Sequence, residues 1–178
     1  VGAATTYNML AGFNALEAGQ GIILVSALSL VAYLTGSPWL AVVGLCMVFA
    51  LIGFILYNIN PAKVFPGDAL TYGVGGLIAI MAILGNFEKI AVFFFIPYII
   101  EVILKSRGKL RKSSFGKPRE DGSLDLKYDK IYSLNHLAIY LLKKSNLKAT
   151  ENKAVLLIML FQIAVIFITF LIFRSTIF

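Results

Sequence analysis

The chain has 178 residues, of which 59% are hydrophobic and only 14% are charged. Soluble proteins have about 45–50% apolar and about 25% charged residues, so this chain has too little polar surface to cover a water-soluble globule. The same numbers exclude a disordered chain, a collagen, a coiled coil and a disulfide scaffold. The one cysteine, Cys46, leaves no disulfide framework. Although the net charge of +7 would raise nucleic acid as a partner of a soluble protein, the composition predicts a membrane protein.

Long apolar runs mark the expected membrane spans. About 20 helical residues cross the roughly 30 Å of hydrocarbon, and two of the five runs reach this length while three are slightly shorter. No run alternates strictly between apolar and polar residues, so helices are expected and not membrane strands. Residues 1–9 are interpreted as the end of an earlier helix. We predict an all-α integral membrane protein with about five transmembrane helices, at Ala18–Thr35, Pro38–Ile59, Ala69–Gly85, Lys89–Leu104 and Lys153–Phe173.

The positive charge is distributed unevenly along the chain. Twelve of the sixteen Lys and Arg residues lie between Lys105 and Lys148, whereas the short turns at Gly36–Pro38 and Gly85–Glu88 carry none. Loops rich in Lys and Arg stay preferentially in the cytoplasm, which predicts a cytoplasmic face for this loop. Counting spans then places residues 8–20 and 60–68 on the same face. The expected organisation is membrane helices in residues 1–105, a basic loop in 106–152, and a last membrane helix with its tail in 153–178.

The basic loop is expected to contain a little regular structure. Asp121-Gly122 is a typical turn pair, with room for a short strand on either side. Tyr132–Lys144 has apolar residues at helical spacing and ends in two lysines, which is typical of a helix lying in the membrane interface. Membrane spans on both sides and the lack of a recognition module argue against nucleic acid as a partner.

Two ionisable residues have simple structural interpretations. Glu101 lies in an apolar run, where a charged residue normally indicates function, but an i,i+4 pair with Lys105 accounts for it. His136 is the only histidine, which excludes metal sites built from paired imidazoles. Its position in the expected interface helix favours a structural residue over a base.

The polar residues at the expected cytoplasmic ends of the spans are the candidates for chemistry. Asp68 directly precedes an apolar run, which fits a helix N-cap and also a carboxylate that holds a hard cation at the membrane boundary. Asn8, Asn14 and Glu17 lie in a segment whose simplest interpretation is a polar helix end. Its glycines would also let a ligand approach the backbone closely.

Two motifs in these segments resemble those of an enzyme family. Asn8-x-x-Ala-Gly-x-Asn-x-Leu-Glu-Ala-Gly, followed further along by Phe65-x-Gly-Asp, is similar to the motifs of the polyprenyl-phosphate N-acetylhexosamine-1-phosphate transferases, glycosyltransferase family 4. Within this family the chain most resembles the eukaryotic and archaeal UDP-N-acetylglucosamine–dolichyl-phosphate N-acetylglucosaminephosphotransferases. The hairpin Ile83–Lys89, the segment Phe93–Pro97 and the tract around Glu151 match as well. The resemblance covers essentially the whole chain, but only the second half of the family's usual length.

The resemblance implies an activity and a metal site. Family members transfer a sugar 1-phosphate from a UDP-sugar to a lipid phosphate at the cytoplasmic face and release UMP. The implied substrates are UDP-N-acetylglucosamine and a polyprenyl or dolichyl phosphate, in the first membrane step of lipid-linked oligosaccharide synthesis. Asn8 and Asp68 match the metal ligands, and Asp68 is the catalytic candidate. Their amide and carboxylate oxygens suit Mg²⁺, with Mn²⁺ as a substitute.

The resemblance also assigns the residues that bind the nucleotide. Gly12, Asn14 and Phe65 match the uridine pocket, where glycine leaves room for the base, the phenyl ring stacks on it and the amide meets its edge. The Arg-His-Arg cluster of eukaryotic members is replaced by Ser113–Gly116. Lys117 and Arg119 are then the nearest cations for the diphosphate or the sugar. Because of this replacement, the identity of the amino sugar stays open.

Other functions stay open beside this one. The acidic pair and the lysine that the family carries on earlier helices are not in the sequence, so we expect the isolated chain to be inactive. A small membrane transporter would use Asp68 and Glu101 as coupling sites, and an inactive membrane scaffold is a third interpretation. A homodimer is compatible with each of them. The expected location is the cell membrane in a prokaryote or the endoplasmic reticulum in a eukaryote.

Overall fold

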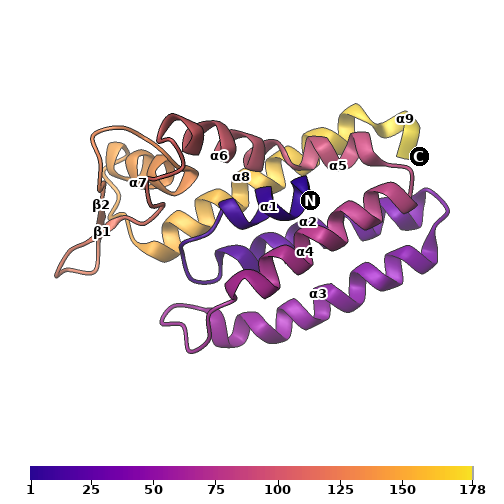
Figure 1. The fold of residues 1–178 in the computed structure, drawn as a ribbon, viewed down its shortest axis with the longest axis horizontal. Helices are drawn as coiled ribbons and strands as arrows, with labels where there is room; N and C mark the ends of the chain where they lie inside the picture. The colour runs from indigo at the N-terminus through magenta and orange to yellow at the C-terminus, as the bar shows by residue number, and fades with distance from the viewer. Residues whose placement is uncertain (178) are drawn as a thin grey trace.

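The structure, a computed structural model, describes residues 1–177 as a bundle of long helices with a small folded loop at one end (Figure 1). Within these residues, four helices are long and apolar enough to cross a membrane, which confirms the all-α membrane class. They are α2 (Leu16–Leu34), α3 (Pro38–Asn58), α4 (Gly67–Leu84) and α8 (Glu151–Ile172). The shorter elements are α1 (Gly2–Met9), α5 (Glu88–Phe94), α6 (Ile96–Arg107), β1 (Lys117–Pro118), β2 (Leu124–Asp125), α7 (Leu134–Lys144) and α9 (Arg174–Ile177).

The expected span at Lys89–Leu104 is not one continuous helix. It is divided at Phe95 into α5 and α6, because Pro97 has no N–H to donate and its ring crowds the preceding turn. The buried Gln162 of α8 donates a hydrogen bond to the Phe94 carbonyl at 2.9 Å. A side chain from a neighbouring helix therefore satisfies the backbone at the break, as a membrane interior requires.

The starts of two helices test the expected capping residues. Helix α3 begins at Pro38 with Ser37 at the N-cap position, although the serine hydroxyl makes no capping hydrogen bond. The interpretation of Asp68 as an N-cap is wrong. Helix α4 already starts at Gly67, and Pro66 occupies the position before it, with φ and ψ angles of −67° and −36°. Asp68 therefore lies in the first turn, where the helix dipole favours a negative charge.

The short helix α1 packs closely on α4. Gly75 is the contact point, since a Cβ atom at this position would lie 2.7 Å from Ala4 Cα and 2.9 Å from the Ala3 carbonyl oxygen. Helix α1 also contacts α6, where the ring of Tyr7 stacks on that of Tyr98 with 5.2 Å between the ring centroids. These contacts fix the end of α1, from which the chain enters the loop of residues 10–15.

The small folded loop has the elements that the sequence predicts. Strands β1 and β2 pair antiparallel, with Lys117 opposite Asp125. The turn between them contains Gly122 at φ +74°, and the Asp121 carboxylate accepts hydrogen bonds from the backbone and hydroxyl of Ser123. Helix α7 follows, with its buried face against α8 and α6.

The polar connections gather at one end of the bundle. The turns after α2 and α4 lie at the opposite end, whereas the α1–α2 connection (loop 10–15), the α3–α4 connection (loop 59–66) and the strands with α7 lie together (Figure 1). This convergence is the arrangement that the alternation of spans predicts, and it creates the candidate site.

Candidate functional site

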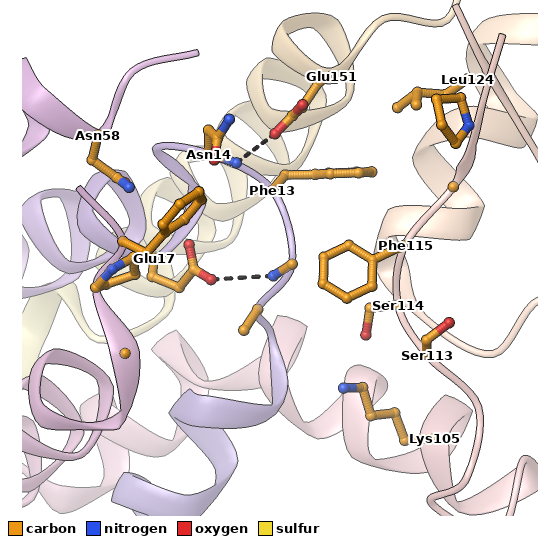
Figure 2. Close-up of a pocket in the computed structure, with 17 residues that line it drawn as sticks. Phe13, Asn14, Glu17, Asn58, Lys105, Ser113, Ser114, Phe115, Leu124 and Glu151 are labelled. Carbon is orange, nitrogen blue, oxygen red and sulfur yellow. Dashed lines mark hydrogen bonds between the residues drawn. The ribbon is translucent and has the colours of Figure 1, made fainter. Parts of the chain in front are cut away.

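A cavity of about 800 Å³ opens where these connections meet, and we call it the main cavity. Its volume lies within the range of about 300–1,000 Å³ that is usual for small-molecule sites. Residues from five parts of the chain face it, and Figure 2 shows their side chains. The lining is Ala11–Asn14, Glu17, Asn58, Phe65–Gly67, Lys105, Ser113–Gly116, Pro118, Leu124 and Glu151.

Loop 10–15 forms one wall of the main cavity. Gly12 has a φ angle of +133°, which a side-chain-bearing residue rarely adopts, and its backbone N–H donates to Glu17 Oε1 at 3.1 Å (Figure 2). This bond connects the loop to the first turn of α2. The tight conformation turns the backbone of Gly12 and Asn14 toward the cavity.

Asn58, the last residue of α3, connects this wall to the next one. Its side chain is fully buried, accepts a hydrogen bond from the Ala15 N–H at 2.9 Å and donates one to the Val64 carbonyl at 2.8 Å. Since Val64 precedes Phe65, one amide group fixes the spacing between loop 10–15 and loop 59–66.

Glu151, the first residue of α8, makes a second connection between the same two loops. One carboxylate oxygen accepts from the Asn14 N–H at 2.6 Å, and the other accepts from Asn60 Nδ2 at 3.1 Å. Figure 2 shows the first of these bonds at the upper edge of the cavity. Asn58 and Glu151 therefore hold both loops in one arrangement.

The opposite wall is built by α6, α7 and the segment 113–116. The Glu101 carboxylate is buried at the start of α7, where it accepts from the Ser133 hydroxyl at 2.8 Å and from the Leu134 N–H at 2.6 Å. The expected pair with Lys105 is confirmed, at 3.8 Å between Nζ and Oε1. Glu101 thus has a structural role that the sequence did not indicate, because it joins α6 to the N-terminus of α7.

His136 attaches the segment 113–116 to α7. Its Nδ1 accepts a hydrogen bond from the Tyr132 N–H, and its Nε2 lies 3.3 Å from the Phe115 carbonyl. A backbone N–H can only donate and a carbonyl can only accept, so the ring is neutral with its proton on Nε2. Burial lowers the pKa of His136, and the neighbouring charges of Lys105 and Lys127 lower it further. The residue is buried in the folded loop and does not face the cavity as a base.

Three of the predicted site residues come together on the main cavity. Gly12 and Asn14 approach it from loop 10–15, and Phe65 approaches it from loop 59–66. These are the residues assigned to the uridine pocket. Phe65 is 74% exposed, so its ring is free to receive a planar group.

The two predicted metal ligands lie beside the cavity and do not line it. Asn8 and Asp68 are both near Thr71, whose hydroxyl lies 2.9 Å from Asn8 Oδ1 and 3.3 Å from the Asp68 carbonyl oxygen. The Asp68 side chain is exposed and makes no hydrogen bond or ion pair within residues 1–177. An amide oxygen and a free carboxylate are suitable donors for Mg²⁺. Within residues 1–177, there is no cluster of three or more His, Cys, Asp or Glu residues that could hold a metal.

The two predicted cations, Lys117 and Arg119, do not line the main cavity. Arg119 makes an ion pair and a hydrogen bond with Asp125, which also pairs with Lys143. The β-hairpin therefore places Pro118 on the cavity and directs the guanidinium toward the hairpin's own carboxylate.

Sequence reasoning gave no site role to four residues that line the cavity. Glu151 lay in a tract that matched the family, but nothing in the sequence indicated that it reaches the loops. Asn58 ends an apolar run, Lys105 was assigned to an ion pair, and Ser114 was noted only as part of the segment that replaces a basic cluster. Their roles depend on contacts between residues far apart in the chain.

Residues 1–86, which contain both motifs, match the sequence profile of glycosyl transferase family 4. The match covers just under half of the chain. The matched residues include loop 10–15 and loop 59–66, which carry the residues of the predicted uridine pocket.

The chain is also similar to individual members of glycosyl transferase family 4. It is 38% identical over 135 residues to a protein of Saccharolobus solfataricus, and 36% identical over 138 residues to one of Sulfolobus acidocaldarius. Both are named as UDP-N-acetylglucosamine–dolichyl-phosphate N-acetylglucosaminephosphotransferases, and the matches cover 75% and 76% of this chain. A phospho-N-acetylmuramoyl-pentapeptide-transferase of Staphylococcus carnosus is 34% identical over 103 residues, which is 58% of this chain and 32% of that protein. The chain spans about two fifths (42%) of the length of the two archaeal relatives.

Proposed function

We propose that the chain forms the nucleotide-binding part of an enzyme that transfers N-acetylglucosamine 1-phosphate from UDP-N-acetylglucosamine to a polyprenyl or dolichyl phosphate, with release of UMP. The observation that carries this proposal is the gathering of Gly12, Asn14 and Phe65 on one cavity. The names of the archaeal relatives supply the substrates. Because the matches cover only 42% of these relatives, the activity is proposed for the protein at their length.

The three residues suit the recognition of a uracil base. Phe65 offers an exposed aromatic face for stacking, and Asn14 offers both a donor and an acceptor for the base edge. Gly12 keeps a side chain out of this part of the cavity. A Cβ atom at this position would lie 3.3 Å from Asn135 Nδ2. The bonds from Glu17, Asn58 and Glu151 hold the loops before a ligand arrives, which lowers the ordering cost of binding.

Asn8 and Asp68 are the proposed ligands of Mg²⁺, or of Mn²⁺ in its place. The bound cation would polarise the diphosphate and offset the negative charge that develops on the departing UMP. Asp68 is the catalytic candidate because its carboxylate is exposed and free of other partners within the described residues. The basic loop supports a cytoplasmic location of this face, in a cell membrane or in the endoplasmic reticulum.

Transport is less well supported than transfer. Transporters place their coupling groups near the middle of the membrane, whereas the connections that line the main cavity lie at one end of the bundle (Figure 1). Glu101, one of the two coupling candidates, has both carboxylate oxygens occupied by Ser133 and Leu134. A purely structural scaffold would not need a cavity whose loops are fixed by three polar contacts.

The test is transfer of radiolabelled N-acetylglucosamine 1-phosphate to dolichyl phosphate by the purified full-length protein in detergent, with and without Mg²⁺. We expect activity that requires Mg²⁺ and that Asp68→Ala abolishes, while Glu120→Ala, an exposed carboxylate of the basic loop, leaves it unchanged. Near wild-type turnover by Asp68→Ala would show that the metal assignment is wrong. If the wild-type protein transferred no sugar phosphate from any UDP-sugar, the proposed function would be wrong.

A further inference from the structure

The walls of the main cavity differ in charge. Glu17 and Glu151 stand on the side of loop 10–15, and each carboxylate receives hydrogen bonds from backbone or amide N–H groups. Within residues 1–177, Lys105 is the only cation that lines the cavity, and it stands on the opposite wall (Figure 2). A negatively charged part of a ligand would therefore be directed toward Lys105.

The ammonium group of Lys105 is available for such a ligand. Its nearest carboxylate is that of Glu101, at 3.8 Å, which is beyond hydrogen-bonding distance. Both oxygens of Glu101 already accept hydrogen bonds, from Ser133 and from the Leu134 N–H. Beyond this ion pair, no acceptor lies within hydrogen-bonding distance of Lys105 Nζ in the part of the chain that the structure describes, so its ammonium still has N–H groups to offer a ligand.

Ser114 supplies a second, independent feature of the same wall. It lines the cavity and is only 5% exposed, yet its hydroxyl has no hydrogen-bond partner within residues 1–177. Its Cβ atom lies 3.5 Å from the Cβ position of Gly12, so it faces the loop of the predicted uridine pocket. Leaving a buried hydroxyl unpaired is unfavourable, and an acceptor on a ligand would satisfy it.

The adjacent serine differs in this respect. Ser113 Oγ accepts a hydrogen bond from Lys127 Nζ at 3.1 Å and lies 3.3 Å from the hydroxyl of Tyr128. Its hydroxyl already has partners in the folded loop. Only Ser114 combines burial, a place on the cavity and an unused hydroxyl.

We propose that Lys105 and Ser114 bind the phosphoryl groups of the nucleotide whose base lies between Asn14 and Phe65. The proposal deepens the proposed function and depends on it. Phosphate oxygens accept hydrogen bonds from both an ammonium and a hydroxyl, and lysine serves as a point charge for phosphate. This pair takes the place that the sequence had assigned to Lys117 and Arg119.

The same two side chains could bind a lipid phosphate, but we assign them to the phosphoryl groups of the nucleotide. The reason is position, because Lys105 and Ser114 line the same cavity as Asn14 and Phe65. A ligand that stacks its base on Phe65 can extend its diphosphate across this cavity toward Lys105.

Affinities for uridine, UMP and UDP test the assignment of Lys105. These are measured by isothermal titration calorimetry on the full-length protein in detergent, for the wild type and for Lys105→Met, Lys105→Arg and Lys117→Met. We expect Lys105→Met to weaken UDP binding by about tenfold to a hundredfold, as for the loss of a charge-assisted hydrogen bond, and to leave uridine binding unchanged. Lys105→Arg should retain most of the UDP affinity, and Lys117→Met should behave as the wild type.

A matched pair of variants tests Ser114. Ser114→Ala should weaken UDP binding by about threefold to tenfold without affecting uridine, whereas Ser113→Ala should change neither. Unchanged uridine affinity in each variant also shows that the protein is folded.

Three outcomes would overturn the inference. UDP affinity that is unchanged in both Lys105→Met and Ser114→Ala would remove it while leaving uridine binding and the proposed function intact. A loss confined to the Michaelis constant for dolichyl phosphate would assign the pair to the lipid phosphate instead. Failure of the wild-type protein to bind any uridine nucleotide would overturn the proposed function together with this inference.

Discussion

Glu151 accepts a hydrogen bond from the backbone N–H of Asn14, with 2.6 Å between its Oε1 and the nitrogen. The two residues are 137 positions apart, so the last long helix directly holds the loop between the first two helices. The other oxygen of the same carboxylate accepts from Asn60 in loop 59–66. A helix to which the sequence assigned no site residue therefore sets the geometry of that site.

Replacing this carboxylate should weaken nucleotide binding. Glu151→Ala removes the acceptor of both loops, and we expect the affinity for UDP to fall by about tenfold, since hydrogen bonds to charged groups contribute about 1.5–3 kcal/mol. Glu151→Gln should cost less, because its amide oxygen can still accept from Asn14. Calorimetric titration with UDP measures both values. Glu120→Gln, an exposed position in the basic loop, is the control. Equal affinities in the wild type and Glu151→Ala would mean that loop 10–15 keeps its conformation without this contact.

Replacing Asn58 should reduce stability more than replacing Glu151, because Asn58 is fully buried. Asn58→Ala leaves the Ala15 N–H and the Val64 carbonyl without partners, at about 1–3 kcal/mol for each unsatisfied group. Asn58→Asp keeps the acceptor for Ala15 but sets a carboxylate against the Val64 carbonyl, so loop 59–66 should move.

The measurements for Asn58 are thermal unfolding and hydrogen exchange of residues 59–66. Both variants should lower Tm, and faster exchange in loop 59–66 should accompany a loss of uridine affinity. Asn152→Ala, at an exposed position of α8, is expected to change neither quantity. If Asn58→Asp bound uridine as the wild type does, the coupling between the two loops would not matter for binding.

Much of the fold could be predicted because it follows from local physics. Apolar runs of sufficient length specify helices in a membrane, and the alternation of spans dictates which connections share an end. The β-hairpin followed from the turn pair Asp121-Gly122, and helix α7 from its periodicity. The break at Phe95 also has a local cause, because Pro97 is visible in the sequence. The hydrogen bond that satisfies the backbone at this break comes from Gln162 of α8, which the local sequence does not reveal.

The site could be predicted only where a motif was continuous in the sequence. Asn14 and Phe65 were found in this way and line one cavity. Lys105 and Glu151 were not, because their relation to the cavity arises from packing between distant helices. Proximity in sequence favoured Arg119 as the cation, whereas its actual partner is Asp125, on the neighbouring strand of its own hairpin.

Two adjacent glycines of α4 allow a matched test of helix packing. A Cβ atom at Gly75 would lie 2.7 Å from Ala4 Cα, which is backbone and cannot give way, so Gly75→Ala should push α1 off α4 and destabilise the protein by about 1–3 kcal/mol. A Cβ atom at Gly76 would meet nothing within 4 Å, so Gly76→Ala should be neutral or stabilise the helix by up to about 1 kcal/mol. Unfolding midpoints in detergent give the comparison. Equal midpoints for the two variants would contradict the close packing of α1 on α4.

His136 should make the folded loop sensitive to mild acid. Burial lowers its pKa in the folded protein, so the unfolded chain takes up the proton first as the pH falls. The stability that the neutral ring provides is therefore complete above its ordinary pKa of about 6.5 and is lost as the pH falls from there through the lowered folded pKa. Protonation of Nδ1 would also break the bond from the Tyr132 N–H.

The measurement for His136 is the unfolding midpoint at several pH values between about 7.5 and 5.5, a window above the titration of most carboxylates. The wild-type midpoint should fall with pH more steeply than that of His136→Gln, whose amide can still donate to the Phe115 carbonyl but does not titrate. Hydrogen exchange of residues 113–116, corrected for the intrinsic effect of pH, should rise over the same window in the wild type only. Parallel curves for the two proteins would show that another group controls this dependence. Since Ser114 and Phe115 line the main cavity, the steeper curve would mean that this wall loosens as the pH falls.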